Sequence, residues 1–216
     1  MKLYGHPFSS YCQKTLIALY ENDTKFEFVF LAPDETGAAQ LAALWPMKRM
    51  PVLVDGDRTV VETTIIIEYL GLYHPGSTRL VPEDARVALG VRMIDRFFDN
   101  YVMTPMQKIV FDSLRNADNR DAQGVAEAHA ALDLAYGWLE HTLSGRTWAA
   151  GETFSLADCA AAPALFYAHW VHPIGDAHSN LQAYLRRLRA RPSFARALEE
   201  ARPYRSVFPV NMPAPE

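Results

Sequence analysis

The sequence predicts a protein of two successive units, a small α/β unit followed by an all-helical unit. Strand-like and helix-like segments alternate over the first 75 or so residues, and strand signals stop after a stretch rich in proline, glycine and serine at 74–83. A chain of 216 residues has room for two modest domains, because a domain commonly has about 100–150 residues. We therefore predict a first domain at 1–76 and a second at 84–216.

The first unit has the element order β-α-β-α-β-β-α. Short β-branched and aromatic runs indicate its strands, and 3.6-residue apolar spacing or a high alanine content indicates its helices. The predicted elements are strands at 2–5, 25–31, 52–54 and 59–61 and helices at 10–20, 35–44 and 63–73. Asp55-Gly56 between the last two strands is typical of a hairpin. Two βα units with parallel strands, followed by a hairpin and a helix, form a small α/β sandwich.

The second unit contains helical patterns and no strand pattern. Its predicted helices lie at 84–114, 123–143, 155–167, 181–189 and 193–201. Thr104-Pro105 predicts a kink in the first of them, because proline lacks the N–H that continues a helix. Ser155 with Asp158 is typical of a capping box at a helix start. We expect the tail, 202–216, to be coil.

The composition excludes several classes of protein. Half of the residues are hydrophobic and 21% are charged, which excludes a disordered chain. The formal net charge of −4 gives no electrostatic support for nucleic-acid binding. Two cysteines, Cys12 and Cys159, exclude a disulfide scaffold. No apolar run approaches the roughly 20 residues of a membrane span and no secretory leader is visible, so we expect a soluble, cytoplasmic protein with no membrane partner.

The first candidate site is the turn Ser9-Ser10-Tyr11-Cys12, between the first strand and the first helix. In open α/β folds, ligands bind at the carboxyl ends of strands, and the free amides of a helix N-terminus favour an anion such as a thiolate. A serine hydroxyl there can donate a hydrogen bond to a bound sulfur; alternatively, Ser9 or Ser10 only caps the helix. No cysteine precedes Cys12 by three residues, so a dithiol mechanism is excluded and Cys12 is interpreted as a small buried hydrophobe.

The second candidate is Met50-Pro51, directly before a predicted strand. A cis bond at this proline would aim the Met50 amide and carbonyl outward, towards a ligand. Lys48 and Arg49 add two cations beside it, or form only a solvated charge pair.

The third candidate is Glu62-Thr63, where the hairpin meets the following helix. A helix N-terminus with a hydroxyl can hold a carboxylate, and Glu62 can receive an ammonium group. Together they suit the zwitterionic head of an α-amino acid, although a simple helix cap is the alternative.

No metal site is expected. The seven histidines lack metal-ligand spacing, and His169 and His172, three residues apart, have no cysteine or carboxylate in a zinc-like pattern. A Gly-rich phosphate loop and the G-x-S-x-G nucleophile motif are also missing from the sequence.

In their order and spacing, these motifs resemble the glutathione transferase superfamily over essentially the whole chain. Ser9 stands at the leading cysteine of a glutaredoxin-like C-P-Y-C turn, as in bacterial serine-type members (theta, zeta or tau-like). The stretch 46–53 is similar to N-P-x-x-x-V-P-x-L, with Pro51 at the cis-proline position. Glu62-Thr63 followed by Ile66 resembles E-S-x-x-I, and 155–158 resembles the capping box of the sixth helix.

The chain departs from the family pattern in three places. Trp45 stands where many members have asparagine, and Thr63 where serine is commoner. Ser10 stands where beta-type bacterial members have cysteine, so Ser9 and Ser10 are both candidates to activate the thiol; we favour Ser9.

The resemblance implies a fold and an activity. The first domain is expected to be thioredoxin-like, with a mixed four-stranded sheet, and the helical domain to carry the electrophile site. The expected reaction joins glutathione, as co-substrate and without a metal, to a small hydrophobic electrophile, as in detoxification. The protein is expected to be a homodimer in which the first domain of one subunit lies against the helices of the other.

The resemblance also assigns residues to roles. The glutathione thiol is expected to be activated by Ser9 or Ser10. The glutathione-binding residues are expected to be Lys48, Arg49, Met50, Pro51, Glu62 and Thr63. The electrophile is expected against Tyr101, Met103, Met106, Gln107, Phe111, Tyr167 and Trp170, which are large side chains of the helical unit.

Other functions on the same fold stay open at this point. One is a glutathione-dependent isomerase of the maleylacetoacetate type, although that group has a cysteine after the two serines where this chain has Tyr11. A disulfide reductase is another, and a non-catalytic glutathione-binding module is a third.

Overall fold

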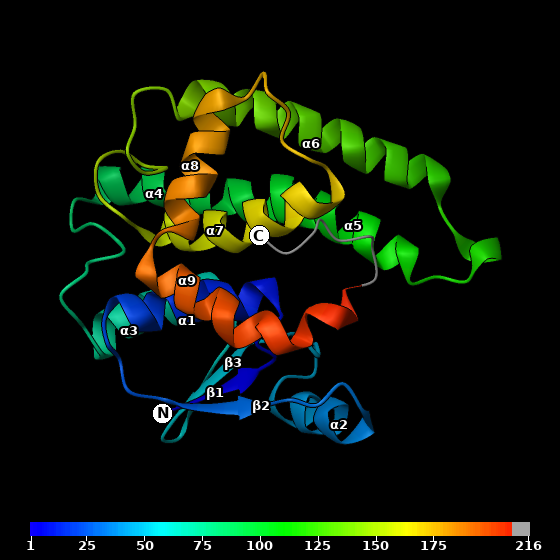
Figure 1. The fold of residues 1–216 in the computed structure, drawn as a ribbon. Coiled ribbons are helices and arrows are strands. Elements are labelled where there is room, and N and C mark those ends of the chain that lie inside the picture. The colour runs from blue at the N-terminus through cyan, green and yellow to red at the C-terminus, as the bar shows by residue number, and fades with distance from the viewer. Residues whose placement is uncertain (209–216) are drawn as a thin grey trace.

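A computed structural model, which describes residues 1–208, divides into an α/β part and a helical part (Figure 1). The α/β part comprises β1 (Lys2–Gly5), α1 (Ser10–Glu21), β2 (Glu27–Phe30), α2 (Glu35–Leu44), β3 (Val52–Asp55), β4 (Arg58–Val60) and α3 (Thr63–Tyr73). The helical part comprises α4 (Ala85–Phe97), the π-helical segment η1 (Phe98–Met103), α5 (Thr104–Ser113), the 3-10 turn η2 (Ala117–Asn119), α6 (Ala122–Thr142), α7 (Leu156–Val171), α8 (Ser179–Arg189), α9 (Pro192–Ala201) and the 3-10 segment η3 (Arg202–Val207). The predicted fold class is confirmed.

The strands form a mixed sheet in the order β2-β1-β3-β4. β1 runs parallel to β2, with Leu3 opposite Phe28, and antiparallel to β3, with Leu3 opposite Leu53. The hairpin between β3 and β4 turns through Gly56, whose φ of 61° lies in the left-handed region that glycine adopts without steric cost. This arrangement is the thioredoxin-like topology that the family resemblance implied.

Helices cover both faces of the sheet. On one face, Leu16 of α1 and Ile66 of α3 share a buried core with Leu53 of the sheet. On the other face, Leu41 of α2 packs over Val52 in a smaller core. The N-termini of α1 and α3 are thereby held in fixed positions beside the carboxyl end of β1.

The helical part is built around α7, which is buried along most of its length. It packs against α1 of the α/β part as well as against α4 and η1. Within the described chain, no helix is both long enough and apolar enough to cross a membrane.

Three differences from the sequence prediction are larger than the shifts of one or two residues at other element ends. α7 continues to Val171 instead of ending near 167, because the stop signal is Pro173, which disfavours helix at the residue before it. The segment 84–114 is interrupted by η1, and Pro105 lies in the first turn of α5, where a missing N–H is tolerated. The tail forms the 3-10 segment η3 where coil was expected, and its remainder, 209–216, lies outside the described residues.

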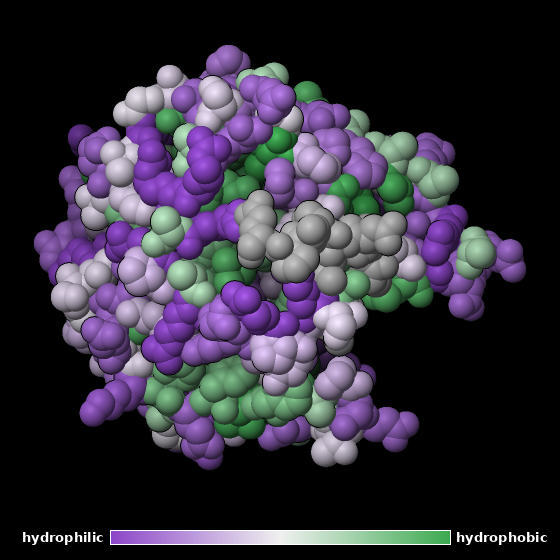
Figure 2. All heavy atoms as spheres, viewed as in Figure 1, coloured by the Kyte–Doolittle hydropathy of each residue, from purple (hydrophilic) through white to green (hydrophobic). Residues whose placement is uncertain are grey.

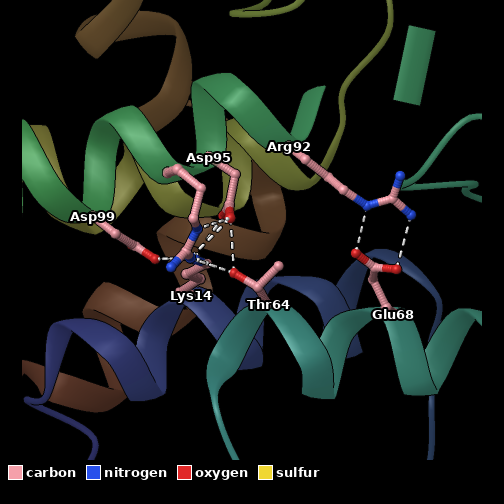
Figure 3. Close-up of polar contacts among 7 residues, drawn as sticks. Lys14, Thr64, Glu68, Arg92, Asp95 and Asp99 are labelled. Atoms are coloured by element: carbon pink, nitrogen blue, oxygen red, sulfur yellow. Dashed lines mark hydrogen bonds and ion pairs between the residues drawn. The ribbon is translucent and has the colours of Figure 1, made fainter. Parts of the chain in front are cut away.

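A buried ion cluster joins the two parts at the α1–α4 contact (Figure 3). Lys14 of α1 is 1% exposed, and its Nζ lies 2.6 Å from Asp95 and 2.8 Å from Asp99. Thr64 of α3 donates to Asp95 at 2.7 Å and accepts from Lys14 at 3.2 Å. Arg96 pairs with both aspartates, so two cations balance two carboxylates. We call these five residues the Lys14 cluster.

Two further ion pairs cross between the parts. Arg92 of α4 holds Glu68 of α3 through two hydrogen bonds of 2.7 and 2.9 Å (Figure 3). At the other end of α1, Glu21 accepts hydrogen bonds from Arg191 and Ser193. Burial alone would raise the pKa of Glu21, but these hydrogen bonds outweigh it and hold that pKa below its usual range. The α1 helix is therefore tied to the helical part at several points.

Removing the Lys14 charge should destabilise the protein. Lys14→Met keeps the length of the side chain but leaves two buried carboxylates with one cation fewer. We expect the free energy of unfolding in urea to fall by about 3–5 kcal/mol, since losing one partner of a buried ion pair leaves uncompensated charge. Lys2→Met is the control, because its pair with Glu27 has exposures of 50% and 61% and should be worth under about 1 kcal/mol. Equal losses in the two variants would contradict this prediction.

Candidate active site

A cleft of about 820 Å³ lies between the α/β part and the helical part. One wall is made by the turn before α1, the segment between α2 and β3, and the N-terminus of α3; η1, α5 and α7 make the other. The space-filling view shows the surface hollowed on the side between α5 and α2 (Figure 2). Small-molecule sites commonly have volumes of about 300–1,000 Å³, so the cleft can hold a ligand the size of a tripeptide with a second reactant.

The cleft collects the residues that the sequence singled out in the α/β part. Those lining it are Ser9, Ser10, Lys48, Arg49, Met50, Pro51, Glu62 and Thr63. They come from three segments far apart in the sequence, which the sheet and its covering helices bring to one edge.

Ser9 is the N-cap of α1. Its backbone is extended, with φ −75° and ψ 123°, and its Oγ accepts the N–H of Cys12 at 3.4 Å. A hydroxyl has one proton and two acceptor lone pairs, so accepting from Cys12 does not use the proton of Ser9. The first turn of α1 has no acidic residue, so its partial positive charge is not offset within the helix. Ser10 lines the same cleft but is only 8% exposed, which favours Ser9 as the group facing a ligand.

The segment before β3 presents main-chain and cationic groups. The Met50–Pro51 peptide bond is cis, the form that the family resemblance implied. Pro51 is buried and Met50 is partly exposed at the cleft wall. Lys48 and Arg49 are exposed at its edge, where an anionic ligand group could reach them.

The N-terminus of α3 is open towards the cleft. Glu62 is the N-cap residue but makes no side-chain capping hydrogen bond, and Thr63 is buried behind it. The φ of Glu62 is 68° and that of Lys48 is 53°, a left-handed backbone that costs a residue with a Cβ about 1–2 kcal/mol. Strained positions of this kind concentrate at functional sites, which supports a ligand-binding role for this part of the cleft.

The helical wall contains part of the expected electrophile set. Met106, Gln107, Phe111 and Tyr167 line the cleft. Tyr101 is 60% exposed and Met103 is 1% exposed in the core, and neither lines it. Both lie in η1, whose wider turn rotates side chains away from the positions of a regular α-helix. Trp170 packs against Phe8 instead of lining the cleft.

Several residues that line the cleft belong to no sequence motif, so the sequence alone did not identify them as site residues. Phe208 stacks on Tyr167, with ring centroids 6.1 Å apart, and closes one end of the apolar wall. Arg96 and Asp99 reach the cleft from the Lys14 cluster. Burial, with a smaller contribution from Asp99, raises the pKa of Tyr11 to about 12, so its phenol stays protonated at neutral pH.

Cys12 lies beneath the turn and is fully buried. A Cβ at Gly5 would lie 2.5 Å from its Sγ, so only glycine allows β1 and Cys12 to pack this closely. Burial raises the pKa of Cys12 to about 11, against the smaller opposing effects of hydrogen bonds with Ser9 and with the His6 backbone. The thiol is therefore protonated at neutral pH, and the thiolate is the nucleophilic form.

Metal ligation finds no support among residues 1–208, where no group of three or more His, Cys, Asp and Glu side chains is arranged to hold an ion.

Two family models match the chain. The model described as "Glutathione S-transferase, N-terminal domain" matches residues 3–78, and the model described as "Glutathione S-transferase, C-terminal domain" matches residues 102–192. The first match contains the turn before α1, the cis-proline segment and the N-terminus of α3. The second contains α5 and α7 of the opposite wall.

Individual relatives agree with these matches. The chain is 25% identical over 207 residues to glutathione S-transferase F7 of Arabidopsis thaliana, covering 92% of this chain and 99% of that protein. It is 29% identical to a glutathione S-transferase of Methylobacterium radiotolerans solved in complex with glutathione sulfonate, with a TM-score of 0.79 over 91% of this chain and 93% of that one. A glutathione S-transferase of Methylobacillus flagellatus with GSH bound has a TM-score of 0.83 at 23% identity, over 91% and 98% of the two chains. This last likeness is evidence of the fold alone.

Because Cys12 is buried, we expect its thiol to react slowly with thiol reagents in the native protein. A pKa of about 11 leaves only about one thiolate in 10,000 at pH 7. With a disulfide reagent we expect no fast-reacting thiol in the native protein and two after denaturation, one for each cysteine. Ser9→Cys is the positive control, since it places a thiol at the helix N-cap within the cleft. A native thiol that reacts as fast as free cysteine would show that Cys12 is accessible.

Proposed function

The chain belongs to the glutathione S-transferase superfamily, and from this premise we propose that it binds glutathione and activates the thiol for attack on a small hydrophobic electrophile. The observation that carries the proposal is the meeting of Ser9, the cis Met50–Pro51 segment and the N-terminus of α3 in one cleft. These three features suit a thiol, a peptide unit and an amino-acid head group, which are the parts of glutathione.

Ser9 acts on the sulfur in this proposal. A free thiol has a pKa near 8.5, and each unit by which it is lowered needs about 1.4 kcal/mol in favour of the anion. One hydrogen bond donated to a charged acceptor supplies about 1.5–3 kcal/mol, and the N-terminus of α1 adds positive potential. The Ser9 hydroxyl, at the N-cap of α1, can therefore convert a weak nucleophile into a strong one at neutral pH.

In this proposal, the segment around Met50 and the N-terminus of α3 bind the remaining groups of glutathione. The Met50 main chain pairs with the cysteinyl unit. The free amides of α3 at Thr63 receive the γ-glutamyl carboxylate, and Glu62 receives its ammonium group. Lys48 or Arg49 faces the glycyl carboxylate. The exposed position of these two cations and the uncapped N-terminus of α3 support these assignments.

The second reactant lies against the helical wall. Met106, Phe111 and the ring of Tyr167 offer an apolar surface opposite Ser9, which favours a small hydrophobic electrophile. A reaction that consumes glutathione, in a chain whose two cysteines are free, suits a reducing compartment, and we place the protein in the cytoplasm.

We also propose a homodimer built on α3 and α4. Large apolar side chains are exposed on both helices: Ile65, Leu72 and Tyr73 on α3 and Val87, Leu89 and Met93 on α4. They flank the Arg92–Glu68 ion pair that joins the two helices. Exposed apolar side chains on two helices joined in this way are typical of an interface, and a two-fold axis would place α3 of one subunit against α4 of its partner.

Replacing the proposed thiol activator should raise the pKa of bound glutathione. For Ser9→Ala we expect a rise of about 1–2 units, read from the pH dependence of the bound thiolate's ultraviolet absorbance, and a fall of about 10- to 100-fold in kcat/KM with an activated aryl halide. Glutathione affinity, measured by calorimetry, should change little. Ser10→Ala is the matched control and should keep the wild-type pKa. Full activity in Ser9→Ala with unchanged affinity would exclude this role for Ser9.

The dimer proposal predicts a molar mass of about twice the 24.3 kDa of the chain by light scattering. Leu72→Glu places a charge in the exposed α3–α4 surface and should reduce the mass to that of one chain. Met47→Glu makes a comparable change on the exposed loop after α2 and should leave the dimer intact. A wild-type protein that is monomeric at micromolar concentration would contradict the proposal.

A further inference from the structure

The turn before Ser9 contains two main-chain carbonyl groups that accept no hydrogen bond from a backbone amide of the described chain. Ser9 N–H donates to His6 O at 2.9 Å, and Gln13 N–H donates to Ser9 O at 2.9 Å. Within the described chain, however, no backbone amide donates to the carbonyls of Pro7 or Phe8. Because these two residues directly precede the N-cap, whatever holds their carbonyls helps to fix the direction of the Ser9 side chain.

Two buried side chains from different parts of the fold hold these carbonyls. Gln13 of α1 is 0% exposed, and its Nε2 donates to Pro7 O at 3.1 Å and to the Tyr167 hydroxyl at 2.9 Å. Tyr167 of α7 in turn donates its proton to Phe8 O at 3.3 Å. A continuous chain of hydrogen bonds therefore runs from the helical part to the turn that carries Ser9.

Neither side chain is placed for reaction chemistry of its own. The Tyr167 proton is already donated to Phe8, and burial raises the pKa of this phenol above its ordinary value, so it stays protonated at any working pH. Gln13 Oε1 is buried and has no partner in the described chain. A buried, unpaired acceptor lowers stability, so stability alone does not account for glutamine at this position.

We propose that Gln13 and Tyr167 are positioning residues, which set the direction of the Ser9 hydroxyl by holding the carbonyls of Pro7 and Phe8. This inference rests on the proposed role of Ser9 in activating glutathione. It adds that α7, which reaches the turn before Ser9 through the side chain of Tyr167, takes part in setting the pKa of the bound thiol. A hydrogen bond to sulfur depends on direction as well as distance, so a small rotation of the turn weakens it.

Tyr167→Phe removes one oxygen and keeps the ring that lines the cleft. We expect the pKa of glutathione bound to this variant to rise by about one unit, and kcat/KM below that pKa to fall about tenfold, while the calorimetric affinity for glutathione stays within about twofold. Gln13→Met should shift the pKa in the same direction. The double variant should shift it no further than the larger single change, because the two side chains act as one unit.

Tyr136→Phe is the matched control. Tyr136 is also buried and also donates to a backbone carbonyl, that of His172 at 3.0 Å, but it does not line the cleft. Its loss should lower the urea midpoint and leave the pKa of bound glutathione unchanged.

The outcomes separate the inference from the proposed function. If wild-type protein does not bind glutathione at millimolar concentration, the proposed function is wrong and the inference falls with it. If glutathione binds but its thiol pKa is the same in wild type, Tyr167→Phe and Gln13→Met, the inference is wrong while the proposed function stands. Should Tyr167→Phe fail to fold, Gln13→Met decides the question by itself.

Discussion

The charge of Lys14 can be buried only beside carboxylates that balance it. This need for counter-charge holds the two parts of the protein together. Its counter-charges, Asp95 and Asp99, belong to the helical part. Burial raises the pKa of Asp99 even though Lys14 opposes the change, so the cost of removing this carboxylate from water is not fully recovered. The Lys14 cluster therefore acts mainly by selecting one arrangement of α1 against α4, since any other would leave a charge buried and unpaired.

The orientation of α1 matters because both walls of the cleft depend on it. Ser9 caps its N-terminus, and the helix lies between the sheet and α7, with nearly every side chain buried. Rotating or sliding α1 would move Ser9 relative to the cis Met50–Pro51 segment on one side and to the apolar helical wall on the other. A polar wall and an apolar wall can thus face each other across the cleft only because the two parts are locked together.

The proposed thiol chemistry depends on the turn before α1 burying Cys12 and exposing Ser9 to the cleft. Cys12 packs against Gly5 under the turn, where its thiol stays protonated, while the Ser9 hydroxyl takes the N-cap position at the surface of the cleft. Free amides and a helix dipole stabilise an anion, but the first turn of α1 has no acidic residue. In the proposed function the anion is the thiolate of glutathione. Burial thus keeps the chain's own sulfur at this turn protonated, while in the proposed function the helix N-terminus makes a bound sulfur reactive.

The sequence alone determined the order of strands and helices and the segments of the α/β part that line the cleft, because periodicity, the turn at Ser9, Pro51 and Glu62-Thr63 are local signals. It did not show that η1 turns Tyr101 and Met103 away from the cleft, since an α-helical period was assumed there. Only the tertiary structure decided the partners of Lys14 and of Tyr167. Their contacts join residues about 50 to 160 positions apart in the chain. Which distant groups meet depends on how whole helices pack, and no pattern of neighbouring residues encodes that packing.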